Sequence, residues 1–266
     1  MIVQKAIDYL KATHSDYIND LRISEVRIGV YMTAVILSDG SCGIASTSLD
    51  EHCCEKKNRD FGDFSPSKIE NQKVTDLLDL SKPSSLIDTL KIAVINAIAS
   101  AIPLNPKYKV LENTDPIDLI DLSGSKTITI VGAFQNYIQT IAGTKNNLFV
   151  LELNENMLSE PHKKFFIPAN EYKRVIPVSD IVILTGLTIV NNTIDGLLES
   201  VSDGTKVIIT GPSAGMIPEV LFKNKVNIIG TTRVTDSRLL MKVVSEAGTG
   251  YHFFRYCAKK ICITSE

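Results

Sequence analysis

The sequence predicts two α/β units in succession, the first mixing helices with an antiparallel hairpin and the second built on a parallel sheet. Three observations support this prediction. The length of 266 residues is nearly twice the roughly 150 residues of a typical domain. The first half combines helical periodicity with a β-rich hairpin pattern. The second half contains five short, nearly continuous apolar runs separated by helix-sized segments, which is typical of a parallel sheet covered on both faces.

The first unit begins with apolar residues at helical spacing, which predict one helix over residues 1–20. The β-rich run 26–37, the turn 38–41 and the apolar run 42–46 predict an antiparallel hairpin. Two further helices are predicted at 74–80 and 85–101, the second with Ser84 as its N-cap. Three prolines between positions 103 and 116 predict a linker. We therefore divide the chain into residues 1–112 and 113–266.

The second unit alternates predicted strands and helices. The strands are residues 127–131, 148–152, 181–185, 206–210 and 226–230, and the helices are 134–142, 193–201, 217–223 and 235–247. This order predicts a Rossmann-like domain.

Composition excludes several classes of protein. With 28 basic and 30 acidic residues the net charge is −2, so we expect no nucleic acid and no membrane surface as a partner. Neither a spanning apolar run nor a signal-peptide pattern is present, which predicts a cytoplasmic protein. Five cysteines, an odd number, predict reduced thiols rather than a disulfide framework.

His52, Cys53 and Cys54 are soft metal ligands in consecutive positions. Adjacent cysteines are strained when they share one tetrahedral site, and no spaced ligand pairs follow them. Whether these three residues bind metal stays open.

The predicted strand ends provide a candidate ligand site, because open parallel sheets bind ligands beyond the carboxyl ends of their strands. Glycines at these ends allow close approach of the backbone, and the neighbouring hydroxyl and amide side chains can orient polar ligand atoms. The alternative is that these residues serve only as turns and caps. The candidate binding residues are Gly132, Phe134, Thr185, Gly186, Thr188, Asn191, Thr193, Gly211 and Ser213, with Asn96 contributed by the first unit.

Glu152 ends the second predicted strand and is the candidate catalytic residue. It could act as a general base, a metal ligand or an acceptor for a ligand hydroxyl, and a salt bridge or a capping role is an equal alternative. It follows Gly132 by twenty positions, as a ribose-binding acid would. The second and third glycines of the dinucleotide fingerprint are missing, however, which argues against NAD(P).

Two runs resemble a known family. Residues 183–193 and 210–222 resemble the patterns T-G-x-T-L-x-N-G-T and G-P-S-x-P-x-x-P-x-L-F of uncharacterised prokaryotic proteins named for putative heavy-metal chelation. The chain departs from them at Asn192, where the family has Gly, and at Gly215, where it tends to have Pro. The resemblance implies an enolase N-terminal-like α+β domain, a Rossmann-like domain and a cleft between them. It also implies a role in handling a metal ion or a metal chelate.

We therefore expect a protein that binds a heavy metal, a metal chelate or another small molecule in the cleft between its domains. The alternative is an enzyme, transferase-like, that uses a nucleotide-type cofactor such as adenosylmethionine at the same sheet edge. The sequence does not decide whether the protein is an enzyme. A homodimer is compatible with a chain of this size.

Overall fold

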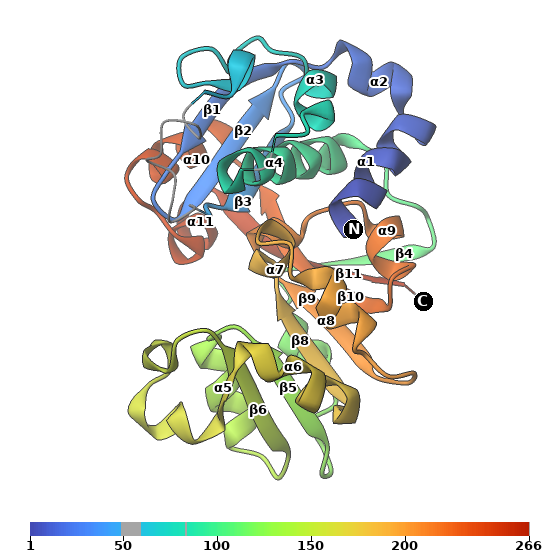
Figure 1. Cartoon of the computed structure of the whole chain (residues 1–266), viewed down its shortest axis with the longest axis vertical. Coiled ribbons are helices and arrows are strands. Elements are labelled where there is room, and N and C mark those ends of the chain that lie inside the picture. Colours follow the sequence, from blue (N-terminus) through green and yellow to red (C-terminus); the bar gives the residue numbers. More distant parts are fainter. Residues whose placement is uncertain (49–59, 83, 266) are drawn as a thin grey trace.

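The computed structural model describes residues 1–48, 60–82 and 84–265, and these residues form two sheets (Figure 1). The first is a three-stranded antiparallel sheet in the order β1-β2-β3. The second is an eight-stranded, mostly parallel sheet in the order β4-β11-β10-β9-β8-β5-β6-β7. The predicted mixed α/β fold is confirmed.

The small sheet contains β1 (Ile23–Ile28), β2 (Met32–Leu37) and β3 (Cys42–Ser46). The predicted antiparallel hairpin is present as β2 and β3, but the chain also reverses at Gly29 and divides the long β-rich run into two strands, β1 and β2. A Cβ atom at Gly29 would lie 2.4 Å from the carbonyl oxygen of Val244. Val30 and Tyr31 in the turn are exposed although apolar, so the run shows no polar break where it turns.

The N-terminal helices are α1 (Ile2–Thr13), α2 (Ser15–Asp20), α3 (Val74–Asp79) and α4 (Ser85–Ala101). The single helix expected over the first twenty residues is interrupted at His14. Helix α4 has its predicted bounds, although Ser84 occupies the N-cap without a side-chain hydrogen bond to the helix. The same helix packs directly on β3.

The other face of the small sheet is covered by helices from the end of the chain, α10 (Ser237–Ser245) and α11 (Gly250–Tyr256) (Figure 1). Leu240, Met241 and Phe253 form one buried cluster with Ala34 and Ile44 of the sheet. The N-terminal sheet is therefore completed by residues about two hundred positions later.

All five predicted parallel strands are present in the large sheet, as β5 (Thr127–Val131), β6 (Asn147–Glu152), β8 (Ile181–Thr185), β9 (Lys206–Thr210) and β10 (Val226–Val234). A short strand, β7 (Phe166–Pro168), continues beyond β6. The chain builds β5-β6-β7 in one direction and then crosses to β8-β9-β10 on the other side of β5. The strand order therefore reverses between β5 and β8, as in Rossmann-type sheets.

Two antiparallel strands complete this sheet, β4 (Tyr108–Glu112) and β11 (Ala258–Ser265). The prediction of a linker over residues 103–116 is wrong at β4, which pairs with β11 along its whole length. The partner strand lies about 150 residues away, so local sequence carries no sign of this pairing. The domain boundary at residue 112 stays a prediction.

Helices cover both faces of the large sheet. Buried residues of α5 (Gln135–Ala142) pack on one face, while α8 (Ile194–Glu199) and α9 (Pro218–Phe222) pack on the other. Short helices fill the connections: α6 (Tyr172–Val175), α7 (Leu187–Val190), η2 (Gly62–Phe64), η3 (Pro116–Leu119), η4 (Glu155–Met157), η5 (Glu160–Phe165), η6 (Ala169–Glu171), η7 (Ile176–Val178) and η8 (Pro212–Ala214). Within the described ranges no helix has the length and apolar character needed to cross a membrane.

The described cysteines, Cys42, Cys257 and Cys262, are buried and free. Burial raises the pKa of Cys42 and of Cys262 to about 12, so both thiols are protonated at neutral pH. His52, Cys53 and Cys54 lie outside the described residues.

Candidate functional site

A cavity of about 710 Å³ lies at the carboxyl ends of β5, β6 and β8, where the strand order reverses; we call it the switch-point cavity. Ligands of open α/β sheets bind at this position. Seven of the predicted site residues line it: Gly132, Phe134, Glu152, Thr185, Thr188, Asn191 and Thr193. The connections that follow three different strands, β5, β6 and β8, therefore bring these residues around one space.

Gly132 shapes the first wall of this cavity. Its φ is +105°, and a Cβ atom there would lie 3.2 Å from the side chain of Thr185. A side chain would therefore be strained by the backbone conformation and crowded by the neighbouring strand. The glycine lets the β5 and β8 connections approach each other at the cavity.

The hydroxyl and amide side chains after β8 also bond to one another. Thr188 Oγ1 donates to the carbonyl oxygen of Thr185 at 2.6 Å, and Thr193 Oγ1 donates to Asn191 Oδ1 at 2.7 Å. These bonds are the turn and cap contacts that were the alternative interpretation. The same side chains also line the cavity. Their hydrogen bonds to one another therefore fix the positions of the groups that a ligand would contact.

Glu152 is the one acidic side chain among the described residues that line the switch-point cavity. Its Oε1 accepts a hydrogen bond from the backbone N–H of Leu153 at 2.7 Å. The surrounding wall is largely apolar, with Leu153, Tyr172 and Leu187 among its members. This arrangement suits an organic molecule that places a hydroxyl or a cationic group beside the carboxylate.

The other four predicted residues lie elsewhere. Gly186 packs against the backbone of η8, since a Cβ atom there would lie 2.9 Å from the nitrogen of Ala214. Ser213 is fully buried, and its Oγ accepts a hydrogen bond from the backbone N–H of Ser46 at 2.8 Å. Its hydroxyl thus joins the small sheet to the large sheet. Gly211 and Asn96 line two other cavities.

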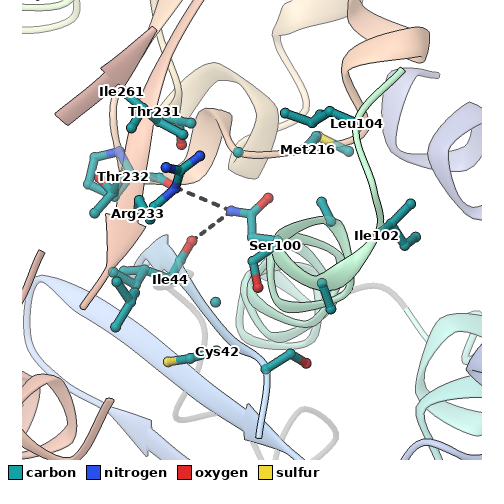
Figure 2. A pocket seen from close by; sticks show the side chains of 18 of the residues that line it. Cys42, Ile44, Ser100, Ile102, Leu104, Met216, Thr231, Thr232, Arg233 and Ile261 are labelled. Carbon is teal, nitrogen blue, oxygen red and sulfur yellow. Dashed lines mark hydrogen bonds between the residues drawn. The ribbon is translucent and has the colours of Figure 1, made fainter. Parts of the chain in front are cut away.

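Asn96 faces a cavity of about 670 Å³ between the small sheet, the end of α4 and β10, which we call the interdomain cavity. Figure 2 shows Thr231, Thr232 and Arg233 reaching it from β10, opposite Ser100 of α4. We expected one cleft between the domains. The predicted residues instead line separate cavities: Asn96 lines the interdomain cavity, and seven others line the switch-point cavity. The reason is that α4 and β3 contact η8, whereas the switch-point cavity is lined by residues 131–197.

Gly211 lines a smaller cavity of about 330 Å³ that sequence analysis did not predict. In it Asp115 accepts hydrogen bonds from the Tyr137 hydroxyl and, at 2.6 Å, from Lys260 Nζ. Burial raises the pKa of Tyr137, and the bond to Asp115 raises it further. Burial opposes ionisation of Asp115, yet the bonds from Lys260 and Tyr137 lower its pKa overall. No motif marked these residues, because Asp115 and Lys260 are 145 positions apart.

These cavities share lining residues. Phe134 lines both the switch-point cavity and the small cavity, while Thr231 and Thr232 line both the small cavity and the interdomain cavity. The three spaces therefore follow one another along the carboxyl edge of the large sheet.

A bare metal ion does not fit the described part of these sites. Across residues 1–48, 60–82 and 84–265, no three His, Cys, Asp or Glu side chains are placed to share one ion. The switch-point cavity supplies one carboxylate, together with neutral hydroxyl and amide groups. Soft heavy metals prefer thiolate and imidazole ligands, which this lining lacks in its described residues.

The C-terminal part of the chain, residues 115–263, matches a family model described as "Putative heavy-metal chelation". The chain belongs to this family. A second model with the same description matches residues 12–99, so family membership covers both halves. An uncharacterized protein from Methanocaldococcus jannaschii is 25% identical over 214 residues, which are 77% of this chain and 76% of that protein.

Two solved structures of family members with unknown function are similar to this chain. The protein from Pyrococcus horikoshii superposes with a TM-score of 0.74 at 22% identity, covering 98% of this chain and 97% of the other. The protein from Desulfitobacterium hafniense superposes with a TM-score of 0.69 at 16% identity, covering 97% and 98%. At these identities the likeness establishes the fold alone.

Proposed function

We propose that this protein binds a metal in the form of an organic chelate, and that the chelate occupies the switch-point cavity. The observation that carries the proposal is the lining, which joins a broad apolar wall to one carboxylate and several neutral polar groups. A volume of about 710 Å³ falls within the usual range for small-molecule pockets, roughly 300–1,000 Å³.

The shortage of metal ligands in the described residues is consistent with a chelate, because the chelator supplies most of the coordination itself. The organic part of the ligand would rest on Phe134, Tyr172 and Leu187. Glu152 would accept a hydrogen bond from a ligand hydroxyl or contribute one oxygen to the metal. The family description, heavy-metal chelation, supports a metal as part of the ligand.

Isothermal titration calorimetry with Ni²⁺, citrate and the Ni²⁺–citrate complex tests this proposal. We expect the complex to bind more tightly than either component, and Glu152→Gln to weaken it about tenfold, since a hydrogen bond to a charged group is worth about 1.5–3 kcal/mol. The matched control is Glu155→Gln, because Glu155 is exposed in η4 and is not part of the lining. The melting temperature of Glu152→Gln should stay within about 2 °C of wild type. Equal affinities of wild type and Glu152→Gln for the complex would refute the role of the carboxylate.

One observation favours a second candidate, an enzyme with a nucleoside-type cofactor. Glu152 ends β6, which neighbours β5, and it follows Gly132 in the β5 turn by twenty residues. An acid at this place binds the ribose hydroxyls in Rossmann-type sites. Titration with adenosylmethionine separates the two functions: binding of this cofactor, with no binding of the chelate, would replace the first proposal by the second.

A further inference from the structure

The interdomain cavity is lined by residues with buried oxygen atoms that have no hydrogen-bond partner among the described residues. Asn96 and Thr231 are 6% and 8% exposed, and within the described residues neither Asn96 Oδ1 nor Thr231 Oγ1 makes a hydrogen bond. Thr232 Oγ1 is also a buried atom without a hydrogen-bond partner among the described residues. Burial of an unpaired polar atom is unfavourable, so such atoms usually bind water, an ion or a ligand.

The amide of Asn96 is held in one orientation. Its Nδ2 donates to the carbonyl oxygens of Ile44, at 2.7 Å, and Pro212, at 3.3 Å. The amide therefore joins the small sheet to η8 and uses both of its hydrogens. Oδ1 is left as a fixed acceptor, and only a donor group can satisfy it.

Gly215 lies close to both of these oxygens. A Cβ atom at Gly215 would lie 2.9 Å from Thr231 Oγ1 and 3.6 Å from Asn96 Oδ1. The two unpaired oxygens are therefore near each other, beside a backbone position that has no room for a side chain. Gly215 has a negative φ of −71°, so its backbone does not itself require glycine.

The described lining of this cavity includes a cation. Arg233 is the one charged residue among the described residues that line it. The carboxylate of Glu112 is shared between Arg233 and Lys259, which lies 3.8 Å away. Two cations with one carboxylate leave one net positive charge, which attracts an anion.

We propose that the interdomain cavity is a second ligand site, separate from the chelate site, which binds a small hydroxylated organic anion. A ligand hydroxyl donates to Asn96 Oδ1 and contacts Thr231 Oγ1 where these residues line the cavity beside Gly215. The anionic end, a carboxylate or a phosphate, lies toward Arg233. Hydroxycarboxylates and sugar phosphates share this chemistry, and the cavity has the volume for either.

Calorimetry on the full chain with L-malate and sn-glycerol 3-phosphate tests the site and distinguishes the two sources of the anion. Inorganic phosphate serves as the probe that lacks a hydroxylated carbon chain. We expect one of the two hydroxylated probes to bind, and phosphate alone to bind at least tenfold more weakly, because it leaves Asn96 Oδ1 unsatisfied.

Two variants locate the binding. Thr231→Val removes the unpaired hydroxyl at nearly constant shape and should weaken the probe about tenfold, the equivalent of one hydrogen bond. Its melting temperature should not fall, because the hydroxyl has no partner to lose. Gly215→Ala places a methyl group against Thr231 Oγ1 and should weaken binding further. Glu152→Gln should leave this affinity unchanged, since Glu152 lies in the other cavity.

Three results would overturn the proposal. In the first, neither hydroxylated probe binds the wild type at millimolar concentration. In the second, wild type and Thr231→Val bind the probe with equal affinity. In the third, a crystal structure with the probe present shows water alone in contact with Asn96 Oδ1. Each of them leaves the chelate proposal intact, because that proposal is decided by the effect of Glu152→Gln, and Glu152 lines only the switch-point cavity among those described.

Discussion

Replacement of Gly43 by alanine tests how closely α4 packs on the small sheet. A Cβ atom at Gly43 would lie 2.1 Å from the carbonyl oxygen of Ala93 and 2.3 Å from the backbone nitrogen of Ala97. Both contacts are with the helix backbone, which cannot rotate away as a side-chain end can. Helix α4 must therefore move off β3, and it carries Asn96 with it.

Insertion of one methyl group into such a site costs about 3 kcal/mol. For a chain of this size each kcal/mol lowers the melting temperature by roughly 2–4 °C, so Gly43→Ala should melt roughly 6–12 °C below wild type. The assay is thermal unfolding followed by circular dichroism. Gly143→Ala is the matched control, because its φ is −79° and a Cβ atom there would find its nearest neighbour at 3.5 Å. A melting temperature for Gly43→Ala within 2 °C of this control would refute the inferred packing.

Three further predictions concern hydrogen-bonded side chains. Asp115→Asn should lower the melting temperature at pH 7, and the difference from wild type should shrink as the pH falls below about 4, because the pKa of Asp115 is lowered from 3.8; the stabilisation by its carboxylate is fully present above about pH 4 and is lost as the pH falls through the lowered value. A difference that stays constant from pH 3 to 7 would contradict this. Ser213→Ala should cost about 1–2 kcal/mol in urea unfolding, since it leaves the buried N–H of Ser46 without its acceptor; an unchanged midpoint would show that the contact between the sheets does not depend on this bond. Thr129→Val should cost about 1 kcal/mol, because the Thr129 hydroxyl pairs with Ser179 at 2.7 Å, and wild-type stability would contradict it.

Sequence reasoning succeeded where structure depends on local pattern. The five parallel strands are continuous apolar runs because helices cover both faces of the sheet, and that pattern is visible without coordinates. Their carboxyl ends share one edge of the sheet, so residues as distant as Gly132 and Thr193 could be expected to surround one cavity. Glu152 was found in this way, from its position at a strand end alone.

The prediction failed where neighbours distant in the chain decide the structure. Strand β4 was expected to be part of a linker, because its pairing with β11 involves residues about 150 positions away. The Ser213 hydroxyl was expected to bind a ligand, but it accepts a hydrogen bond from the backbone of Ser46, which is 167 positions away. The charged group at Asp115 was missed for the same reason. Asn96 was expected to contribute to the site from the first unit, yet only the coordinates reveal which of its atoms lacks a partner among the described residues.

The covering of the small sheet by α10 and α11 affects how the protein is made. During synthesis β1–β3 leave the ribosome about two hundred residues before α10, an interval of roughly 10–40 s at 5–20 residues per second. Throughout this time Ala34 and Ile44 have no cover on the α10 face. The newly made N-terminal half must therefore avoid aggregation, or be shielded by a chaperone, until the last thirty residues emerge. A truncated chain that ends before position 237 would remain in this exposed state permanently.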